Sequence, residues 1–192
     1  MKYVVPLSKR RAIAGLALTA LFAALIAAGT FIAIPLPFSP VPLVMQNLFS
    51  LLAGLILGPL LGGAAVGLYL AAGALGAPVF AGATGGFVHF FGPSGGFLPG
   101  YLLGAVAAGL IAGRPRTGRK TPLRRIIPAV VLGILAVYVP GLLRLKKVMD
   151  AAWPAVLTAG FFPFLPGDAV KGFAAVIIAP RLRRAAADQL DG

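Results

Sequence analysis

Two ionisable side chains three residues apart interrupt a strongly apolar part of the chain, and they are the residues best placed to do chemistry. Positions 164–171 read FLPGDAVK, and Asp168 is one of only four acidic residues in the chain. An ionisable group at membrane depth costs about 3 kcal/mol on insertion scales, so it indicates a functional site. Residues three apart on a helix share a face. Asp168 and Lys171 can therefore meet one small ligand that offers donors to the carboxylate and a carbonyl or a charge to the ammonium.

The same pair also has a purely structural interpretation. Asp168 and Lys171 could form an ion pair that only holds their helix in place. A carboxylate near the start of a helix is favoured by the macrodipole whether or not a ligand binds. Both interpretations stay open from the sequence.

Further residues could complete a ligand site. Gln46, near the start of a predicted helix, can donate and accept hydrogen bonds, either to a ligand or to a neighbouring helix. Thr84 could donate its hydroxyl to a ligand or close a turn, and Phe80 could supply an apolar wall. His89 is the only histidine. No second ligand-type residue accompanies it in its loop, so we predict neither a metal site nor a cofactor.

Several classes of catalytic and binding chemistry lack the residues that they need. The chain has no cysteine and no G-x-x-x-x-G-K-[ST] phosphate loop, so we do not expect it to hydrolyse ATP itself. It also lacks a plausible nucleophile–base set or a pair of carboxylates, which argues against an enzyme. The net charge of +13 comes from short basic clusters between apolar runs. That pattern is typical of membrane orientation signals and not of a nucleic-acid surface, so we predict no nucleic-acid partner.

Composition identifies the class of protein that must position these residues. Hydrophobic residues make up 59% of the chain and charged residues 11%, and the mean hydropathy is +0.98. No charged residue stands between Arg11 and Arg114, and each crossing needs about 20 apolar residues. The sequence predicts an all-α integral membrane protein in a single domain over residues 1–192.

Proline, glycine and charge divide the chain into six predicted membrane helices. Their approximate ranges are 11–34, 43–57, 59–76, 97–112, 126–143 and 167–180, and a short helix is expected at about 150–162. Prolines at near-alternate positions between 35 and 42 cannot be helix interior, and Gly58-Pro59 predicts a tight turn. The Gly-rich segment 77–96 is expected to be irregular, which at membrane depth requires cover by protein or a cavity.

The distribution of basic residues predicts the orientation in the membrane. All but four of the 17 Lys and Arg residues lie at the N-terminus, in the loop 114–125 or in the C-terminal region. With six crossings these three clusters share one face, which the positive-inside rule makes cytoplasmic, so both termini are cytoplasmic. Connections 1, 3 and 5 then meet outside, and the helix at 167–180 is too short to span alone. We therefore predict an outward-facing ligand pocket formed by these three loops, with Asp168 below its roof.

Small residues on the first helix suggest a docking face. Ala20, Ala24 and Ala28 recur at four-residue spacing, which permits close helix approach. This face could serve internal packing, a homo-oligomer or a partner membrane protein.

Five blocks of sequence, spread over most of the chain, occur in an order that is typical of one family. They are IPLPFSPVP at 34–42 followed by Gln46, LLAG at 51–54 with LGP at 57–59, GAPVFAG at 76–82, GPSGG at 92–96 and FLPGDAVK at 164–171. Together they resemble the BioY family, the biotin-specific substrate-binding (S) components of energy-coupling factor (ECF) vitamin transporters.

This resemblance implies a six-helix protein in the cytoplasmic membrane that captures biotin from outside. It implies that Asp168 and Lys171 belong to the ligand site, with Thr84, Gly85 and Gly86 as further candidates. It also implies a transmembrane coupling protein and ATPase subunits as partners, for which the alanines of the first helix would be the docking face. Where some family members carry an Arg after the second Gly-Gly, this chain has Phe97-Leu98. The biotin carboxylate would then be bound by Lys171 or by the cluster Arg144, Lys146 and Lys147.

Two alternatives to biotin uptake remain. The chain could be an S component for another vitamin or small heterocycle. It could also be a membrane scaffold that transports nothing, in which the pair Asp168 and Lys171 is structural.

Overall fold

Apolar helices make up most of the structure, a computed structural model that describes residues 7–37 and 39–191. The helices are α1 (Leu7–Ala28), α2 (Gln46–Ala74), α3 (Phe97–Ala112), α4 (Leu123–Met149), α5 (Trp153–Gly160) and α6 (Leu165–Asp191). Two 3-10 helices (Gly29–Phe31 and Phe87–Phe91) and the short antiparallel strands β1 (Ala33–Ile34) and β2 (Leu43–Val44) complete the fold. Phe38, within the first of the five blocks, lies outside the described residues.

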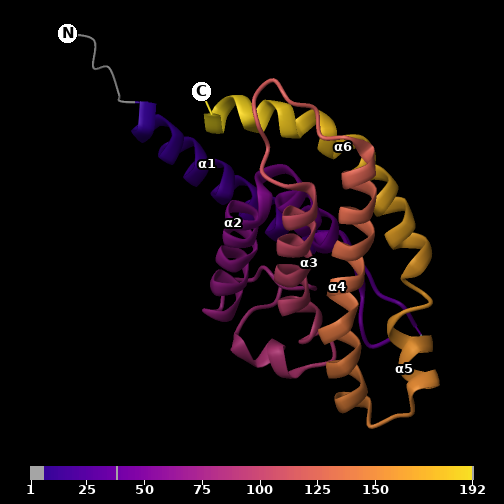
Figure 1. Cartoon of the computed structure of the whole chain (residues 1–192). Helices are drawn as coiled ribbons and strands as arrows, with labels where there is room; N and C mark the ends of the chain where they lie inside the picture. The colour runs from indigo at the N-terminus through magenta and orange to yellow at the C-terminus, as the bar shows by residue number, and fades with distance from the viewer. Residues whose placement is uncertain (1–6, 38, 192) are drawn as a thin grey trace.

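The predicted fold class, an all-α integral membrane protein, is confirmed. Among the described residues, three helical stretches are long and apolar enough to cross a membrane: Lys9–Phe31, Gln46–Ala74 and Leu123–Met149. α5 and α6 form a further candidate, bent by 50°, and α3 is a shorter apolar helix. α2, α3 and α4 pack side by side, and α6 runs along another side of this group of helices (Figure 1).

α2 consists of two antiparallel legs rather than one straight helix. The sequence predicts separate helices over 43–57 and 59–76, and a break does fall at Gly58, whose φ is +83°. A Cβ placed on Gly62 would lie 2.5 Å from the carbonyl oxygen of Ala53, although residues nine apart on a straight helix are about 13 Å apart. The chain therefore folds back at Gly58 and the two legs pack closely together.

The first helix ends earlier than the sequence predicts. The expected helix over 11–34 is α1, which stops at Ala28. Beyond it the Thr30 hydroxyl donates to the carbonyl oxygen of Val79 at 2.5 Å, and the chain then pairs as β1 with β2. These tertiary hydrogen bonds replace the helical ones, and α2 consequently begins only at Gln46, after β2.

The last two long helices extend further than the sequence predicts. The helix expected over 126–143 runs as α4 to Met149, and the one expected over 167–180 runs as α6 to Asp191. Pro180 lies inside α6 and does not end it, but α6 is a candidate span only together with α5, with a bend of 50° between them. Pro removes only one helical hydrogen bond. The short helix expected at 150–162 is α5.

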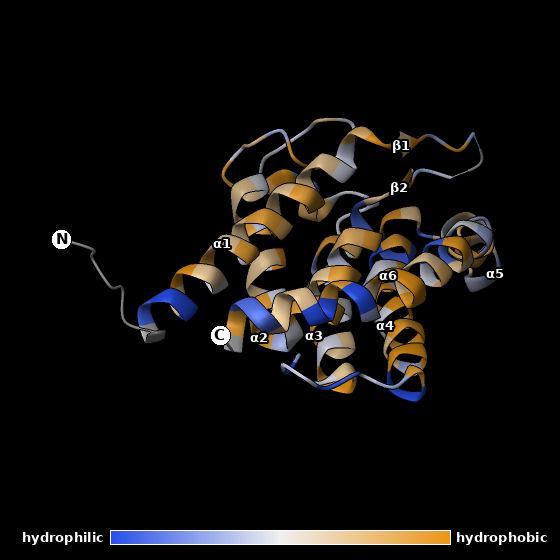
Figure 2. Cartoon of the chain, turned by 90° about the horizontal axis from the view of Figure 1, so that it is seen from above, coloured by the Kyte–Doolittle hydropathy of each residue, from blue (hydrophilic) through white to orange (hydrophobic). Residues whose placement is uncertain are grey.

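The beginning of α1 and the end of α6 lie at the same end of the molecule as the loop between α3 and α4 (Figure 1). Hydrophilic residues mark the beginning of α1, this loop and the C-terminal half of α6, whereas α4 is mostly hydrophobic (Figure 2). The three basic clusters therefore gather at one end. The Gly-rich segment and α5 lie toward the opposite end (Figure 1).

Candidate functional site

The first turn of α6 brings Asp168 and Lys171 together on one face. The ammonium nitrogen of Lys171 lies 3.1 Å from Oδ1 of Asp168. Each residue is only 6% exposed. Removing an ion pair from water has a desolvation cost that can exceed the Coulombic attraction between the two charges. The pair is stable only if its remaining hydrogen-bonding groups find partners in the protein. The surrounding helices supply those partners.

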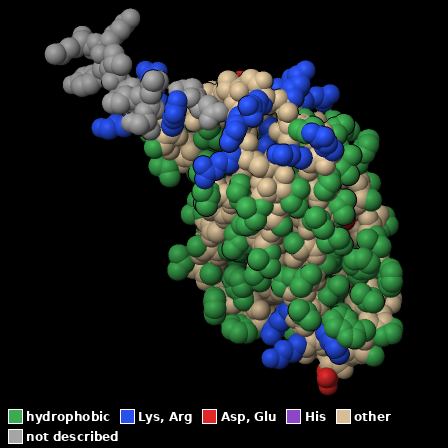
Figure 3. Space-filling view, in the orientation of Figure 1, with side chains coloured by type: hydrophobic (Ala, Val, Ile, Leu, Met, Phe, Trp, Pro, Cys, Tyr) green, Lys and Arg blue, Asp and Glu red, His purple; other side chains and the backbone are tan. Residues whose placement is uncertain are grey.

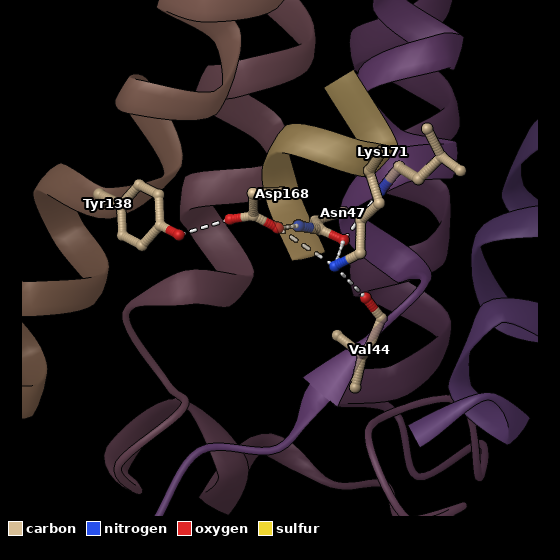
Figure 4. A network of polar contacts seen from close by, with 6 residues as sticks. Val44, Asn47, Tyr138, Asp168 and Lys171 are labelled. Atoms are coloured by element: carbon tan, nitrogen blue, oxygen red, sulfur yellow. Dashed lines mark hydrogen bonds and ion pairs between the residues drawn. The ribbon is translucent and has the colours of Figure 1, made fainter. Parts of the chain in front are cut away.

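Three residues from distant parts of the chain complete the network (Figure 4). Asn47 donates to Oδ1 of Asp168 at 2.8 Å and accepts from Lys171 at 3.0 Å. The Lys171 ammonium also donates to the carbonyl oxygen of Val44 at 2.9 Å, so each of its three hydrogens has an acceptor. The Tyr138 hydroxyl donates to Oδ2 of Asp168. The carboxylate thus accepts from the ammonium, an amide and a phenol.

A small cavity lies beside this network and is walled by four helices. α2, α3, α4 and α6 contribute its lining, which includes Asn47, Leu51, Tyr101, Ile134, Asp168 and Lys171. The free space, counted as room for the centre of a water molecule, is about 20 Å³, which holds about one water. The Tyr101 side chain is 6% exposed. Its hydroxyl has no hydrogen-bond partner within residues 7–37 and 39–191, so the cavity contains an unused donor.

Three other predicted site residues meet at a second cavity. Gln46, Phe80 and Thr84 line it together with His89 and Val44, and its free space by the same measure is about 30 Å³. The sequence prediction treated these residues and the Asp168 pair as one site. In the structure the two groups line different cavities, and Val44 of β2 touches both groups: its carbonyl oxygen accepts from Lys171 and the residue lines the second cavity.

Gln46 joins three parts of the chain. Its Nε2 lies 2.5 Å from the Thr30 hydroxyl, 2.8 Å from the Tyr69 hydroxyl and 2.9 Å from the carbonyl oxygen of Val79. An amide nitrogen has two hydrogens, so it can serve two of these acceptors at a time. Gln46 is 1% exposed. In this arrangement it does what the structural interpretation predicted, and its role toward a ligand stays a prediction.

The glycines of the Gly-rich segment fit tight main-chain contacts. A Cβ on Gly85 would lie 2.2 Å from the carbonyl oxygen of Ala77, and Gly86 has a φ of +109°. The amide of Gly86 donates to the carbonyl oxygen of Gly73 at 2.7 Å. Thr84 donates its hydroxyl to Ala81 at 3.0 Å. The bond from Gly86 joins the segment to the second leg of α2, and the other two contacts lie within the segment. Contact with a ligand stays a prediction for all three predicted residues, Thr84, Gly85 and Gly86.

Basic side chains near the end of α4 lie outside both cavities. Arg144 donates to the carbonyl oxygen of Phe91, and its Cζ lies 5.8 Å from the centre of that ring. The Lys146 ammonium lies 5.4 Å from the Trp153 ring centre and 3.3 Å from the carbonyl oxygen of Ala151. They fasten α4 to the Gly-rich segment and to α5.

The predicted docking residues Ala20, Ala24 and Ala28 are all exposed along α1. Sequence reasoning did not assign Tyr138 or Tyr101 to the site. Tyr138 and Tyr101 are single tyrosines inside apolar helices, so no local pattern marks them. Only the packing of α3 and α4 against α6 shows their part.

Comparison with known proteins gives consistent matches over most of the chain. A model described as the BioY family matches residues 5–188. A probable biotin transporter BioY from Pyrococcus horikoshii is 39% identical over 166 residues, which is 86% of this chain and 94% of that protein. The biotin transporter BioY of Rhodobacter capsulatus is 41% identical over 167 residues, 80% of this chain and 85% of that protein. A crystal structure of the S component for biotin from an ECF-type ABC transporter superposes with a TM-score of 0.81 at 28% identity, covering 94% of this chain and 95% of the other.

Proposed function

This chain belongs to the BioY family, and from that premise we propose that it captures biotin for uptake across the cytoplasmic membrane as the S component of an ECF transporter. The observation that best supports the proposal is the buried network around Asp168 and Lys171, which offers an acceptor and a donor side by side. The relatives' names and the matched S component point to the same ligand.

The ureido ring of biotin is chemically complementary to this pair. Its two N–H groups are donors that the carboxylate of Asp168 can accept, and its carbonyl oxygen can accept from the ammonium of Lys171. Asn47 and Tyr138 now occupy the acceptor sites of Asp168. Binding of biotin would therefore replace hydrogen bonds within the protein by hydrogen bonds to the ligand. The Tyr101 hydroxyl adds a donor that can bind the ligand without breaking an existing hydrogen bond.

Biotin needs more room than the cavity provides, since the free space holds about one water. Capture therefore requires the segments around the cavity to separate. The Pro-rich connection, the Gly-rich segment and the α4–α5 connection are the candidates, because they are the three loops proposed to roof the pocket on the outer side. We propose an open form that admits the ligand and a closed form like the one described.

Arg144 is our candidate for the carboxylate of biotin. A Cβ on Gly96 would lie 2.5 Å from the Cβ of Arg144. The Arg144 side chain therefore lies beside position 97, where this chain has Phe97 and some family members carry a cation. Its Nε is buried and has no hydrogen-bond partner within the described residues. Lys171, by contrast, already uses all three of its donors.

Energy for uptake would come from other proteins. We propose that a transmembrane coupling protein docks on the exposed face of α1 at Ala20, Ala24 and Ala28, and that ATPase subunits act through it. Small residues permit a close helix approach. With most basic side chains gathered at one end of the molecule (Figure 3), we apply the positive-inside rule and propose that both termini are cytoplasmic.

The second candidate function is a membrane scaffold, and one observation favours it. Every polar atom of the Asp168, Lys171 and Asn47 side chains already has a partner within the protein, as a purely structural network requires. A transporter for another vitamin is a third candidate, since other heterocycles also offer N–H and carbonyl groups.

Binding of labelled biotin to the purified protein in detergent distinguishes these candidates. We expect tight binding by the unaltered chain and its loss in Asp168→Asn and Lys171→Ala. Asp188→Asn near the end of α6 and Lys9→Ala at the start of α1 remove the same charges from exposed positions and should bind normally. Competition by other unlabelled vitamins tests specificity. No binding by a well-folded chain would reject biotin, and equal binding by all variants would make the pair structural.

A further inference from the structure

The loop between α3 and α4 encloses a hollow with a strongly positive lining. Its free space, counted as room for the centre of a water molecule, is about 450 Å³, within the roughly 300–1,000 Å³ of small-ligand sites. The basic side chains that line it are Arg114, Arg116, Arg119, Lys120, Arg124 and Arg125. In Figure 3 basic side chains gather at the corresponding end of the molecule. Concave surfaces of one charge focus the field and attract counter-ions.

The six cations contrast with the buried Lys171 and Arg183, which have acceptors inside the protein. Lys171 has Asp168, and the buried Arg183 donates to Leu55, Gly113 and Thr121. No described residue accepts a hydrogen bond from any of the six side chains in the hollow, and no carboxylate of the described part of the chain lines it. Asp188 lines a neighbouring hollow with Arg184, and Arg116, Arg119 and Lys120 line that second hollow as well. All six side chains are exposed, and an anion bound among them would offset their mutual repulsion.

The beginning of α4 increases the positive potential of the same hollow. Pro122 is its N-cap residue and provides no side-chain cap, and no acidic residue stands in the first turn. That turn instead contains Arg124 and Arg125, where the positive end of the helix dipole disfavours cations. An anion seated there would interact favourably with both the dipole and the guanidinium groups.

The position of the hollow identifies the source of that anion. Residues 113–122 connect two apolar helices, so the hollow lies at the level where a bilayer presents its headgroups. We propose that it binds the phosphate group of an anionic phospholipid. Arginine forks match phosphate oxygens, and basic clusters next to membrane helices attract anionic lipids. This proposal does not depend on biotin binding at the other end of the molecule.

A lipid titration in detergent tests the site on the full chain. Dihexanoyl phosphatidylglycerol, a soluble anionic lipid, is titrated into the protein in dodecyl maltoside at low salt and heat is measured. We compare Arg119→Gln/Lys120→Gln, which lies in the hollow, with Lys9→Gln/Arg10→Gln, which removes the same charge from exposed positions at the start of α1. The hollow variant should bind about tenfold more weakly and the control less than about twofold.

Further titrations identify the source of the phosphate and protect against a folding artefact. Arg124→Gln/Arg125→Gln should reproduce the loss, and circular dichroism shows whether each variant remains folded. Dihexanoyl phosphatidylcholine should not bind, because the positive charge of its choline neutralises the negative charge of its phosphate. Equal losses in the hollow and control variants would show diffuse attraction and overturn the site. Displacement of the lipid by inorganic phosphate at equal concentration would overturn a lipid headgroup as the ligand and assign free phosphate instead.

Discussion

The ammonium of Lys171 donates a 2.9 Å hydrogen bond to the main-chain carbonyl of Val44, 127 residues earlier in the chain. Val44 belongs to β2 and also lines the second cavity, which contains Gln46 and Thr84. A ligand that takes over the ammonium must weaken this bond and so loosen β2 from α6. This hydrogen bond therefore links residues that line the two cavities.

We expect Lys171→Met to destabilise the protein strongly. It leaves the carboxylate of Asp168 buried without its cation, and breaking a buried pair typically costs about 3–5 kcal/mol. The double variant with Asp168→Asn should be less destabilised than the sum of the two single variants, because no unpaired charge remains. Unfolding temperatures in detergent for the four proteins form the cycle. Additive effects would show that the two charges do not stabilise each other.

Tyr138→Phe should lower stability through the loss of one hydrogen bond. The Tyr138 hydroxyl donates to a buried carboxylate, and hydrogen bonds to charged groups contribute about 1.5–3 kcal/mol. Tyr101→Phe is the matched control, because it removes a hydroxyl without a partner among the described residues from the same cavity. Thermal unfolding of both variants provides the comparison. If Tyr101→Phe is the more destabilising of the two, the assigned network is wrong.

Local sequence patterns predicted the features that are determined by residues close together in the sequence. The spacing of Asp168 and Lys171 was enough to place them on one face, because helical geometry fixes that relation. Gly58 and Pro59 correctly predicted where α2 folds back, since a positive φ suits glycine and proline suits a first helical turn. The helix expected over 97–112 coincides with α3.

Contacts between distant residues account for what the sequence did not predict. α1 ends early because Thr30 bonds to Val79, a partner that no pattern near Thr30 reveals. Tyr138 reaches Asp168 only through the packing of α4 against α6. The basic residues near position 183 were interpreted together as an orientation signal, yet Arg183 is 3% exposed. Its burial depends on carbonyl groups at the ends of two other helical segments.

Gly73→Ala should destabilise the second leg of α2. A Cβ at this position would lie 2.3 Å from the ring of Phe80, which is itself 2% exposed and cannot move freely. Overpacking of this kind costs about 1–3 kcal/mol. Gly67→Ala in the same leg meets nothing within 4 Å, so its helix propensity should raise stability slightly. Unfolding temperatures that fall equally in both variants would contradict the close contact with Phe80.

Arg183→Lys should lower stability almost as much as Arg183→Gln. The guanidinium donates to the carbonyl oxygen of Leu55, to that of Gly113 at 2.9 Å and to the Thr121 hydroxyl at 2.9 Å. These carbonyls lie at the C-terminal ends of the first leg of α2 and of α3, where a cation is favoured by the helix dipole. A lysine ammonium is a compact point charge that cannot reproduce a planar fork serving several acceptors. Arg183→Lys retains the positive charge but should therefore recover little of the stability that Arg183→Gln loses.

The neighbouring Arg184→Gln is the matched control for this prediction. Arg184 is exposed, so its replacement should leave the unfolding temperature nearly unchanged. Thermal unfolding in detergent, followed by circular dichroism, compares Arg183→Lys, Arg183→Gln and Arg184→Gln with the unaltered chain. Full stability in Arg183→Lys would mean that charge alone matters at this position. The hydrogen bonds that join α6 to the ends of α2's first leg and α3 would then contribute little to the fold.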